Sequence, residues 1–257
     1  MPDPMNPQSL NRYAYCLNNP LKYTDPMGLD VILVGGSGQS ESDLQEYYNY
    51  LVDEGIIDGA EPFVLLPDID PGSGLLNFID IDAGPRLVQL MKELVEGNHK
   101  DIKLLGFSEG AAAVGSFLST LADYPGILSE DVRAQLRAAV LLECPAGGAP
   151  DFVTSGFNRG MLANLPKRLT NAGINMKLAD VWNKASIVHG GKLEGWGKQS
   201  KPYDSRPWWE RGICNVAEFF GQGDLVDASR AARTSSLHTN VLKNKNALKV
   251  IKETFYK

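Results

Sequence analysis

The sequence is poor in cysteine and histidine and contains no long apolar run. Its 257 residues include three widely separated cysteines with no C-x-x-C pair, which favours unpaired thiols over a disulfide framework. Cys144 ends an apolar run and is interpreted as a small core residue rather than a nucleophile. No apolar stretch approaches the length of a membrane span, and Met1-Pro2-Asp3-Pro4 lacks the basic start and apolar region of a signal peptide. We therefore expect neither a transmembrane segment nor a cleavable leader in this chain.

An excess of basic residues is also missing. The formal net charge is −6 at pH 7, which argues against nucleic acid as the main partner, because phosphate-binding surfaces need clustered Lys and Arg. The glycines at 36 and 38 form no dinucleotide fingerprint, since Glu41 stands where a third glycine is needed, and no G-K-[ST] follows. The aspartates at 68, 70, 80 and 82 lack EF-hand spacing and are interpreted as a solvated loop. We expect no cofactor, no bound metal and no nucleic acid partner.

From residue 30 onward the sequence alternates apolar, strand-like runs with helix-like segments. Strands are predicted at residues 30–34, 62–67, 102–105, 138–142 and 216–220, and helices at 42–54, 86–95, 110–122, 129–137 and 240–254. Buried strands alternating with helices form a mostly parallel sheet with helices on both faces. The sequence therefore predicts one α/β domain over residues 30–257, for which a hydrophobic content of 43% supplies a core.

The stretch G-F-S-E-G at residues 106–110 follows the apolar run 102–105 and precedes three alanines. A strand that ends in G-x-S-x-G and leads directly into a helix is typical of the nucleophile elbow of serine hydrolases. The serine of such an elbow occupies a sharp turn, in which the positions two before and two after it nearly touch, so that a Cβ on either would clash. The pattern predicts Ser108 as a catalytic nucleophile.

A serine nucleophile needs a histidine base, and the sequence offers three. His99 precedes the 102–105 strand, at the edge of the sheet opposite the serine, and is interpreted as a surface residue. His189 ends an apolar stretch and stays an alternative. His238 lies in a polar loop before the last helix, where the base is expected when the chain order is Ser, Asp, His, so we favour His238.

The carboxylate that orients the base is expected after a late strand. Residues 216–220 lead into G-Q-G-D-L-V-D, and this G-x-x-D-x-V pattern resembles the place where α/β-hydrolases carry the triad aspartate, which Asp224 matches. Asp227 is interpreted as a helix-capping residue. Glu143, at the end of the 138–142 strand, remains a third candidate, because some hydrolases place the acid one strand earlier.

Two main-chain N–H groups are needed to hold the oxyanion. One is expected from Glu109, and the other from the glycine-rich segment after the first strand, which resembles the oxyanion loops of lipases and esterases. Ser37 is the favoured second donor, with Gly36 close behind. Residues 30–257 thus resemble a serine esterase or lipase of the α/β-hydrolase superfamily.

Residues 1–29 differ from the rest in being rich in proline and turn signals. The runs N-P-Q-S-L-N-R-Y-A-Y at 6–15 and N-N-P-L-K-Y-T-D-P-M-G-L at 18–29 resemble the end of an Rhs/YD-repeat core domain. In that family the shell closes on a D-P-x-G element, a variable C-terminal domain follows, and many members cleave themselves after the leucine. The resemblance implies a domain boundary and a processing point between Leu29 and Asp30. It also implies secretion or delivery within a larger Rhs protein, an effector or toxin role, and a cognate immunity protein as partner.

A long segment, residues 146–212, separates the 138–142 strand from the acid loop. An insertion here in α/β-hydrolases is usually a cap over the serine, and Trp196, Trp208 and Trp209 suit an apolar wall, or else they pin a long loop to the core. The predicted activity is cleavage of carboxylic esters, including lipids and phospholipids, through an acyl-enzyme, with at most peripheral membrane contact. The alternative is a non-catalytic binding module on a hydrolase scaffold, since a fold does not imply a function.

Overall fold

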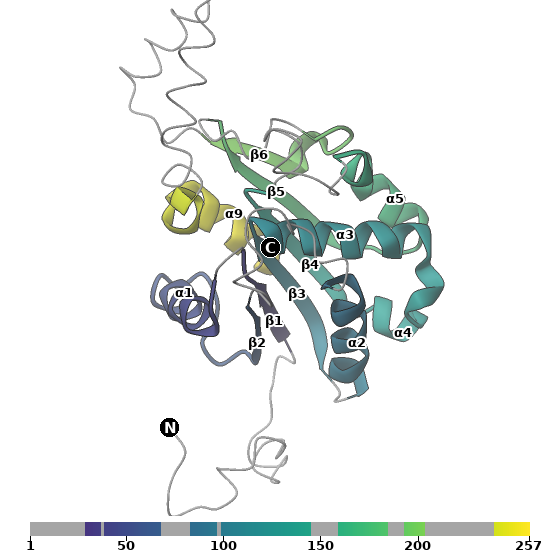
Figure 1. Cartoon of the computed structure of the whole chain (residues 1–257), viewed down its shortest axis with the longest axis horizontal. Coiled ribbons are helices and arrows are strands. Elements are labelled where there is room, and N and C mark those ends of the chain that lie inside the picture. The colour runs from purple at the N-terminus through teal and green to yellow at the C-terminus, as the bar shows by residue number, and fades with distance from the viewer. Residues whose placement is uncertain are drawn as a thin grey trace, which may run out of the picture.

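The computed structural model describes residues 29–36, 39–67, 83–96, 99–144, 159–184, 193–203 and 239–257. Within these ranges, six parallel strands form one sheet in the order β2-β1-β3-β4-β5-β6 (Figure 1). The strands are β1 (Leu29–Val34), β2 (Phe63–Leu66), β3 (Lys100–Phe107), β4 (Leu136–Leu142), β5 (Lys177–Asn183) and β6 (Ser200–Tyr203). Since they all run in the same direction, the segments that follow them meet at one carboxyl-terminal edge. The predicted fold class is confirmed.

Helices cover both faces of this sheet (Figure 1). On one face lie α2 (Ala83–Glu96), α3 (Glu109–Asp123), α4 (Glu130–Arg133) and α5 (Leu165–Asn171), and on the other lie α1 (Glu41–Asp53) and α9 (Lys245–Tyr256). Short 3-10 turns η3 (Pro125–Ile127), η4 (Arg159–Leu162), η5 (Gly197–Gln199) and η6 (Asn240–Lys243) complete the described elements. The central strands are apolar on both sides: in β1, Ile32 packs under α2 and α3 while Leu33 packs under α1.

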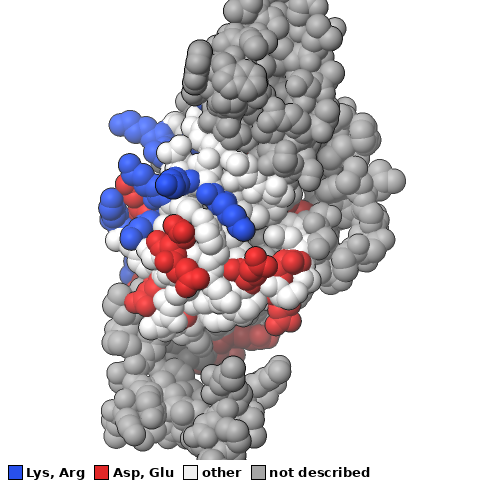
Figure 2. Space-filling model, turned by 90° about the vertical axis from the view of Figure 1, so that its left-hand side faces the viewer, with Lys and Arg blue, Asp and Glu red and all other residues white. Residues whose placement is uncertain are grey.

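The outer surface of α1 and α9 is charged, whereas their inner faces are buried against the sheet. Figure 2 shows acidic and basic side chains in separate groups on this side of the molecule. α1 contains four acidic residues and no basic one, whereas η6 and α9 together contain four lysines and a single acidic residue, Glu253. The apolar residues Leu44, Leu51, Leu248 and Ile251 of the same two helices are buried against the sheet. Each helix is therefore amphipathic, with one side in the core and one side in water.

Two predicted helices differ from the observed ones in where they begin or end. The helix predicted at 129–137 is only the four-residue α4, and β4 already begins at Leu136, because the apolar side chains from there on pack into the sheet. The helix predicted at 240–254 is divided into η6 and α9 at Asn244. The Asn244 side chain caps α9 by accepting hydrogen bonds from the N–H groups of Asn246 and Ala247.

The segment predicted as a cap, residues 146–212, contributes to the sheet and its helical cover wherever the structure describes it. β5 and β6 extend the sheet beyond β4, and η4 and α5 pack on α3, so a cap is not confirmed. Trp196 is fully buried, and its Nε1 donates a hydrogen bond of 2.7 Å to the carbonyl oxygen of Leu162. This tryptophan holds its loop against the core, so for Trp196 the structure agrees with the second of the two interpretations rather than with an apolar wall over the serine.

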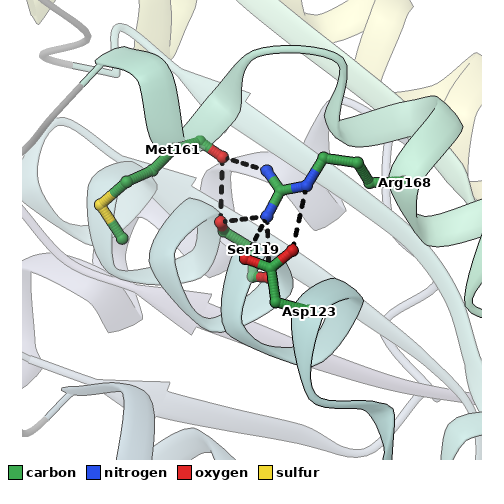
Figure 3. A network of polar contacts seen from close by, with 4 residues as sticks. All are labelled: Ser119, Asp123, Met161 and Arg168. Atoms are coloured by element: carbon green, nitrogen blue, oxygen red, sulfur yellow. Dashed lines mark hydrogen bonds and ion pairs between the residues drawn. The ribbon is translucent and has the colours of Figure 1, made fainter.

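Arg168 of α5 ties this part of the chain to α3 (Figure 3). Its guanidinium donates to the Met161 carbonyl oxygen at 2.6 Å and to the Asp123 carboxylate at 2.6 Å. It also donates to the Ser119 hydroxyl at 3.0 Å, and that hydroxyl donates to the Met161 carbonyl at 2.9 Å. One side chain thus joins η4, α3 and α5, so the helix that starts at the predicted nucleophile is braced along its second half.

Several predictions lie outside the described residues. They are the Rhs-like segment up to residue 28, the strand at 216–220, and Cys16, Cys214, Trp208 and Trp209. In the part of the chain that the structure describes, no helix is both long and apolar enough to cross a membrane. Cys144 is fully buried in the core, as predicted.

Candidate active site

Ser108 occupies the turn that joins β3 to α3. Its backbone has φ 53° and ψ −119°, a conformation that costs a non-glycine residue on the order of 1–3 kcal/mol. The main chain is fixed on both sides: the Ser108 N–H donates to the Leu142 carbonyl of β4 at 2.8 Å, and its carbonyl accepts from the Ala112 N–H of α3 at 3.1 Å. The serine side chain makes no capping hydrogen bond to the helix it precedes. A strained serine held in this way at a strand-to-helix turn is the geometry of a nucleophile elbow.

The two glycines of the motif are required by close backbone contacts. A Cβ on Gly106 would lie 2.5 Å from the carbonyl oxygen of Gly110, which confirms that the positions two before and two after the serine nearly touch. A Cβ on Gly110 would lie 2.2 Å from the carbonyl oxygen of Val34, at the end of β1. The elbow is therefore packed against the start of the glycine-rich segment as well as against itself.

Gly36 lies against the serine. A Cβ at this position would be 2.8 Å from the Ser108 Cβ and 3.0 Å from the Phe107 carbonyl oxygen, so only glycine lets the main chain come this close. β1 and β3 are neighbours in the sheet, and Val34 pairs with Gly106, which brings the two loops together. The structure thus unites Ser108, Glu109 and Gly36 at the carboxyl-terminal edge, whereas Ser37 lies outside the described residues.

The hydrogen bonds of the glycine-rich segment involve a residue that sequence reasoning missed. The Gly35 N–H donates to the Leu66 carbonyl of β2 at 2.9 Å, and the Gly36 N–H donates to Oε1 of Gln39 at 2.7 Å. The Gln39 N–H in turn donates to the Gly36 carbonyl at 3.0 Å. No sequence pattern predicts the contact between the Gln39 side chain and the Gly36 N–H, because it joins a side chain to a main-chain group three residues earlier.

Glu109 is the first residue of α3 and is half-buried. Its N–H belongs to the first turn of a 15-residue helix, where the N–H groups carry the positive end of the helix dipole. A developing negative charge beside Ser108 is stabilised by that dipole. This position fits the role that the sequence predicts for Glu109.

Asp224 and His238 lie outside the described residues, as do Asp227 and His189. The neighbouring Thr239 is described. α9 ends with Tyr256 beside Lys103, whose Nζ is 4.0 Å from the tyrosine ring, near the amino-terminal edge of the sheet. Since α9 extends away from that edge, its beginning and Thr239 before it lie towards the carboxyl-terminal edge. Thr239 thus lies towards the same edge of the sheet as Ser108.

Glu143 links β4 to β5 at this edge. Its side chain is fully buried, its backbone has φ 50°, and its carboxylate accepts a hydrogen bond from the Asn183 N–H. The Glu143 N–H donates to the Val181 carbonyl at 2.8 Å. Burial, and then the negative charge of Glu143, raise the pKa of the Tyr203 hydroxyl, which stays protonated. Glu143, the third candidate for the triad acid, therefore lies one strand from the serine and also joins β4 to β5.

Cys144 and His99 are not part of this constellation. Burial, followed by the charges of Asp180 and Glu143, raises the pKa of the Cys144 thiol, so it remains a neutral core residue. His99 lies at the amino-terminal edge, as predicted, but it is more than a surface residue. Its Nδ1 is 2.8 Å from the carboxylate of Asp30, which is almost completely buried. Among the residues that the structure describes, no group of three His, Cys, Asp or Glu could hold a metal ion.

No family model matches the chain, and no curated protein matches it. Solved structures with a similar arrangement include a lipase-esterase related protein from Clostridium acetobutylicum, with 14% identity, a TM-score of 0.44 and coverage of 76% of this chain and 95% of the other. An esterase/lipase from an uncultured bacterium has 14% identity and a TM-score of 0.44, with 77% of each chain covered. A lipase/esterase from Lactobacillus plantarum has 10% identity and a TM-score of 0.44, covering 76% of this chain and 86% of the other.

Proposed function

We propose that this protein is a serine hydrolase that cleaves carboxylic esters through an acyl-enzyme. The strained backbone of Ser108, packed between β3, α3 and Gly36, is the observation that carries this proposal. Ordinary packing of a helix on a strand does not require a serine with positive φ. The backbone strain of about 1–3 kcal/mol at such a residue persists only where the surrounding structure enforces it. A turn of this kind presents the Oγ at the edge of the sheet, where a substrate carbonyl can reach it.

The proposed reaction combines Ser108 with the residues that the sequence predicts as its partners. His238 removes the proton of the Ser108 hydroxyl as Oγ attacks the ester carbonyl carbon, and Asp224 orients the imidazole. The oxyanion accepts hydrogen bonds from the N–H groups of Glu109 and Ser37. The C–O bond to the alcohol breaks as His238 returns the proton to the leaving oxygen. Water, deprotonated by the same imidazole, then releases the acid and restores the serine.

The substrate class and biological context extend this proposal. We infer an ester or lipid substrate, with phospholipids included, and a role as the C-terminal effector of a larger Rhs protein that is secreted or delivered. The supporting feature is the resemblance of residues 6–29 to the end of an Rhs core, which ends at the first residue of β1. Hydrolysis of p-nitrophenyl esters of two to sixteen carbons, alongside phospholipid vesicles, measures the preference. Turnover limited to short esters would contradict the lipid assignment.

Ser108→Ala tests the chemistry directly. We expect turnover of p-nitrophenyl butyrate to fall by about 10⁴-fold or more, and labelling by a fluorophosphonate probe to disappear. Ser116→Ala is the matched control, because Ser116 lies on α3 in ordinary helical geometry and should keep both signals. Retained turnover in Ser108→Ala would refute the nucleophile. A wild-type protein that neither turns over esters nor reacts with the probe would instead be the non-catalytic binding module.

A further inference from the structure

The exposed sides of α1 and α9 carry opposite charges with the same spacing. On α1, Glu46 and Asp53 are exposed and lie two helical turns apart, so they share one side of the helix. On α9, Lys245 and Lys252 are exposed with the same separation. Figure 2 shows the basic side chains mainly above and the acidic ones mainly below on this side of the molecule. We call the exposed residues of α1, η6 and α9 the bipolar face.

The charges of the bipolar face are not paired with one another inside the protomer. Among the described residues, neither the carboxylates of Glu46 and Asp53 nor the ammonium groups of Lys245 and Lys252 form an ion pair or a hydrogen bond. All four groups can therefore interact with a partner. A single exposed ion pair contributes little to binding, so a suitable partner must offer several opposite charges at matching positions.

An aromatic and partly apolar centre lies between the two charged halves of this face. The ring of Tyr50 on α1 is half-buried, and the Nζ of Lys243 on η6 is 5.6 Å from its centroid. Tyr50 lies on the same side of α1 as the two acidic residues. Leu242 of η6 and Val250 of α9 are also only partly buried. Protein interfaces combine an aromatic or apolar centre of this kind with charged residues around it.

We propose that the bipolar face is the interface of a symmetric dimer, in which the partner is a second copy of this chain. A two-fold axis along the boundary between the two halves places α1 of one protomer opposite α9 of its partner, and symmetry repeats this contact. Both contacts are then attractive, and Tyr50 lies near the axis. An anionic membrane surface fits this face less well, because it attracts α9 and repels α1. The dimer does not depend on the proposed esterase function.

Charge reversal tests the pairing of α1 with α9. Sedimentation velocity of the full chain should show a dimer in low salt that dissociates in about 1 M salt, where charges are screened within about 3 Å. Glu46→Lys/Asp53→Lys and Lys245→Glu/Lys252→Glu should each raise the dimer Kd by about tenfold or more, because every substituted site occurs twice in the interface. An equimolar mixture of the two variants should restore the dimer, since α1 and α9 then attract each other across both contacts. Circular dichroism verifies that each variant is folded.

Lys92→Glu/Lys167→Glu is the matched control for the lysine variant. These exposed lysines lie on α2 and α5, on the other face of the sheet, and their reversal changes the net charge equally, so the dimer Kd should stay unchanged. A wild-type protein that is monomeric in low salt overturns the proposal, as does a dimer that neither reversal weakens. A mixture that stays monomeric overturns it too, because α1 then does not pair with α9. If the monomer binds vesicles of anionic phospholipid and Lys245→Glu/Lys252→Glu does not, the face belongs to a membrane contact and the proposal fails.

Discussion

The two edges of the sheet use polar residues in different ways. At the amino-terminal edge, acidic side chains contact basic ones: Glu61 and Asp101 form ion pairs with Lys103 and Arg137, and Asp30 contacts the His99 ring. At the carboxyl-terminal edge, the described contacts are mainly bonds between side chains and main-chain groups, such as those of Gln39 with Gly36 and Glu143 with Asn183.

This difference indicates that the amino-terminal edge contributes mainly to stability and the carboxyl-terminal edge mainly to the reaction. A charge pair at the amino-terminal edge ties neighbouring strands and helices together without fixing the direction of any N–H group. Bonds to the main chain at the other edge fix loop conformation, which is what an oxyanion site needs, because its donors must point at a charge that exists only during the reaction. We therefore expect substitutions at the carboxyl-terminal edge to change activity and those at the amino-terminal edge to change the free energy of unfolding.

The largest expected effect on kcat distinguishes Asp224 from Glu143, the two carboxylates that could orient the catalytic histidine. Asp224→Asn should lower kcat by about 10⁴-fold, because the imidazole then loses its correct tautomer. Glu143→Gln should lower kcat less than tenfold, since the glutamine oxygen still accepts from the Asn183 N–H and the strands stay joined. Steady-state hydrolysis of p-nitrophenyl butyrate measures both. Asp227→Asn is the control for Asp224→Asn. If the ranking is reversed, Glu143 is the triad acid.

The next effect should fall on stability alone. Lys103 and Glu61 form a pair at 2.9 Å with both side chains almost completely buried, and Lys103→Met would leave the carboxylate uncompensated in the core. We expect a loss of about 3–5 kcal/mol in the free energy of unfolding, measured by urea denaturation. The double variant Lys103→Met/Glu61→Gln should recover most of that loss.

Arg137→Met provides the contrast, because Arg137 is 59% exposed in its pair with Asp101, and exposed pairs contribute about 0–1 kcal/mol. The kcat of folded Lys103→Met should stay within twofold of the wild type. A large fall in kcat with unchanged unfolding would contradict the division between the two edges.

Local patterns were enough to predict the first four strands. β1, β2, β3 and β4 are apolar runs followed by turn signals, and the contact between β1 and the elbow follows from the glycines. β5 and β6 were missed because neither is a continuous apolar run, and polar residues or proline interrupt both of them. β5 contains the buried Asp180, which is satisfied by the Ser200 hydroxyl at 3.0 Å, and β6 contains Pro202, which an edge strand tolerates. In the candidate site, Ser108, Glu109 and Gly36 were predictable from the motif, whereas Gln39 was not. Asp224 and His238 remain predictions.

A more moderate loss of activity should appear where the two loops of the site touch. A Cβ on Gly110 would lie 2.2 Å from the Val34 carbonyl oxygen and 2.4 Å from that of Gly35, so Gly110→Ala must push the serine turn and the oxyanion segment apart. Because a displacement of about 1 Å costs about 100-fold in rate, we expect kcat/KM to fall about 100-fold, or about 2.7 kcal/mol. Gly126→Ala is the matched control, since no atom lies within 4 Å of its added Cβ. Urea unfolding of the same variant should show a loss of about 1–3 kcal/mol. If Gly110→Ala kept full activity, the two loops would not need their close contact, and catalysis would not depend on the geometry of this edge.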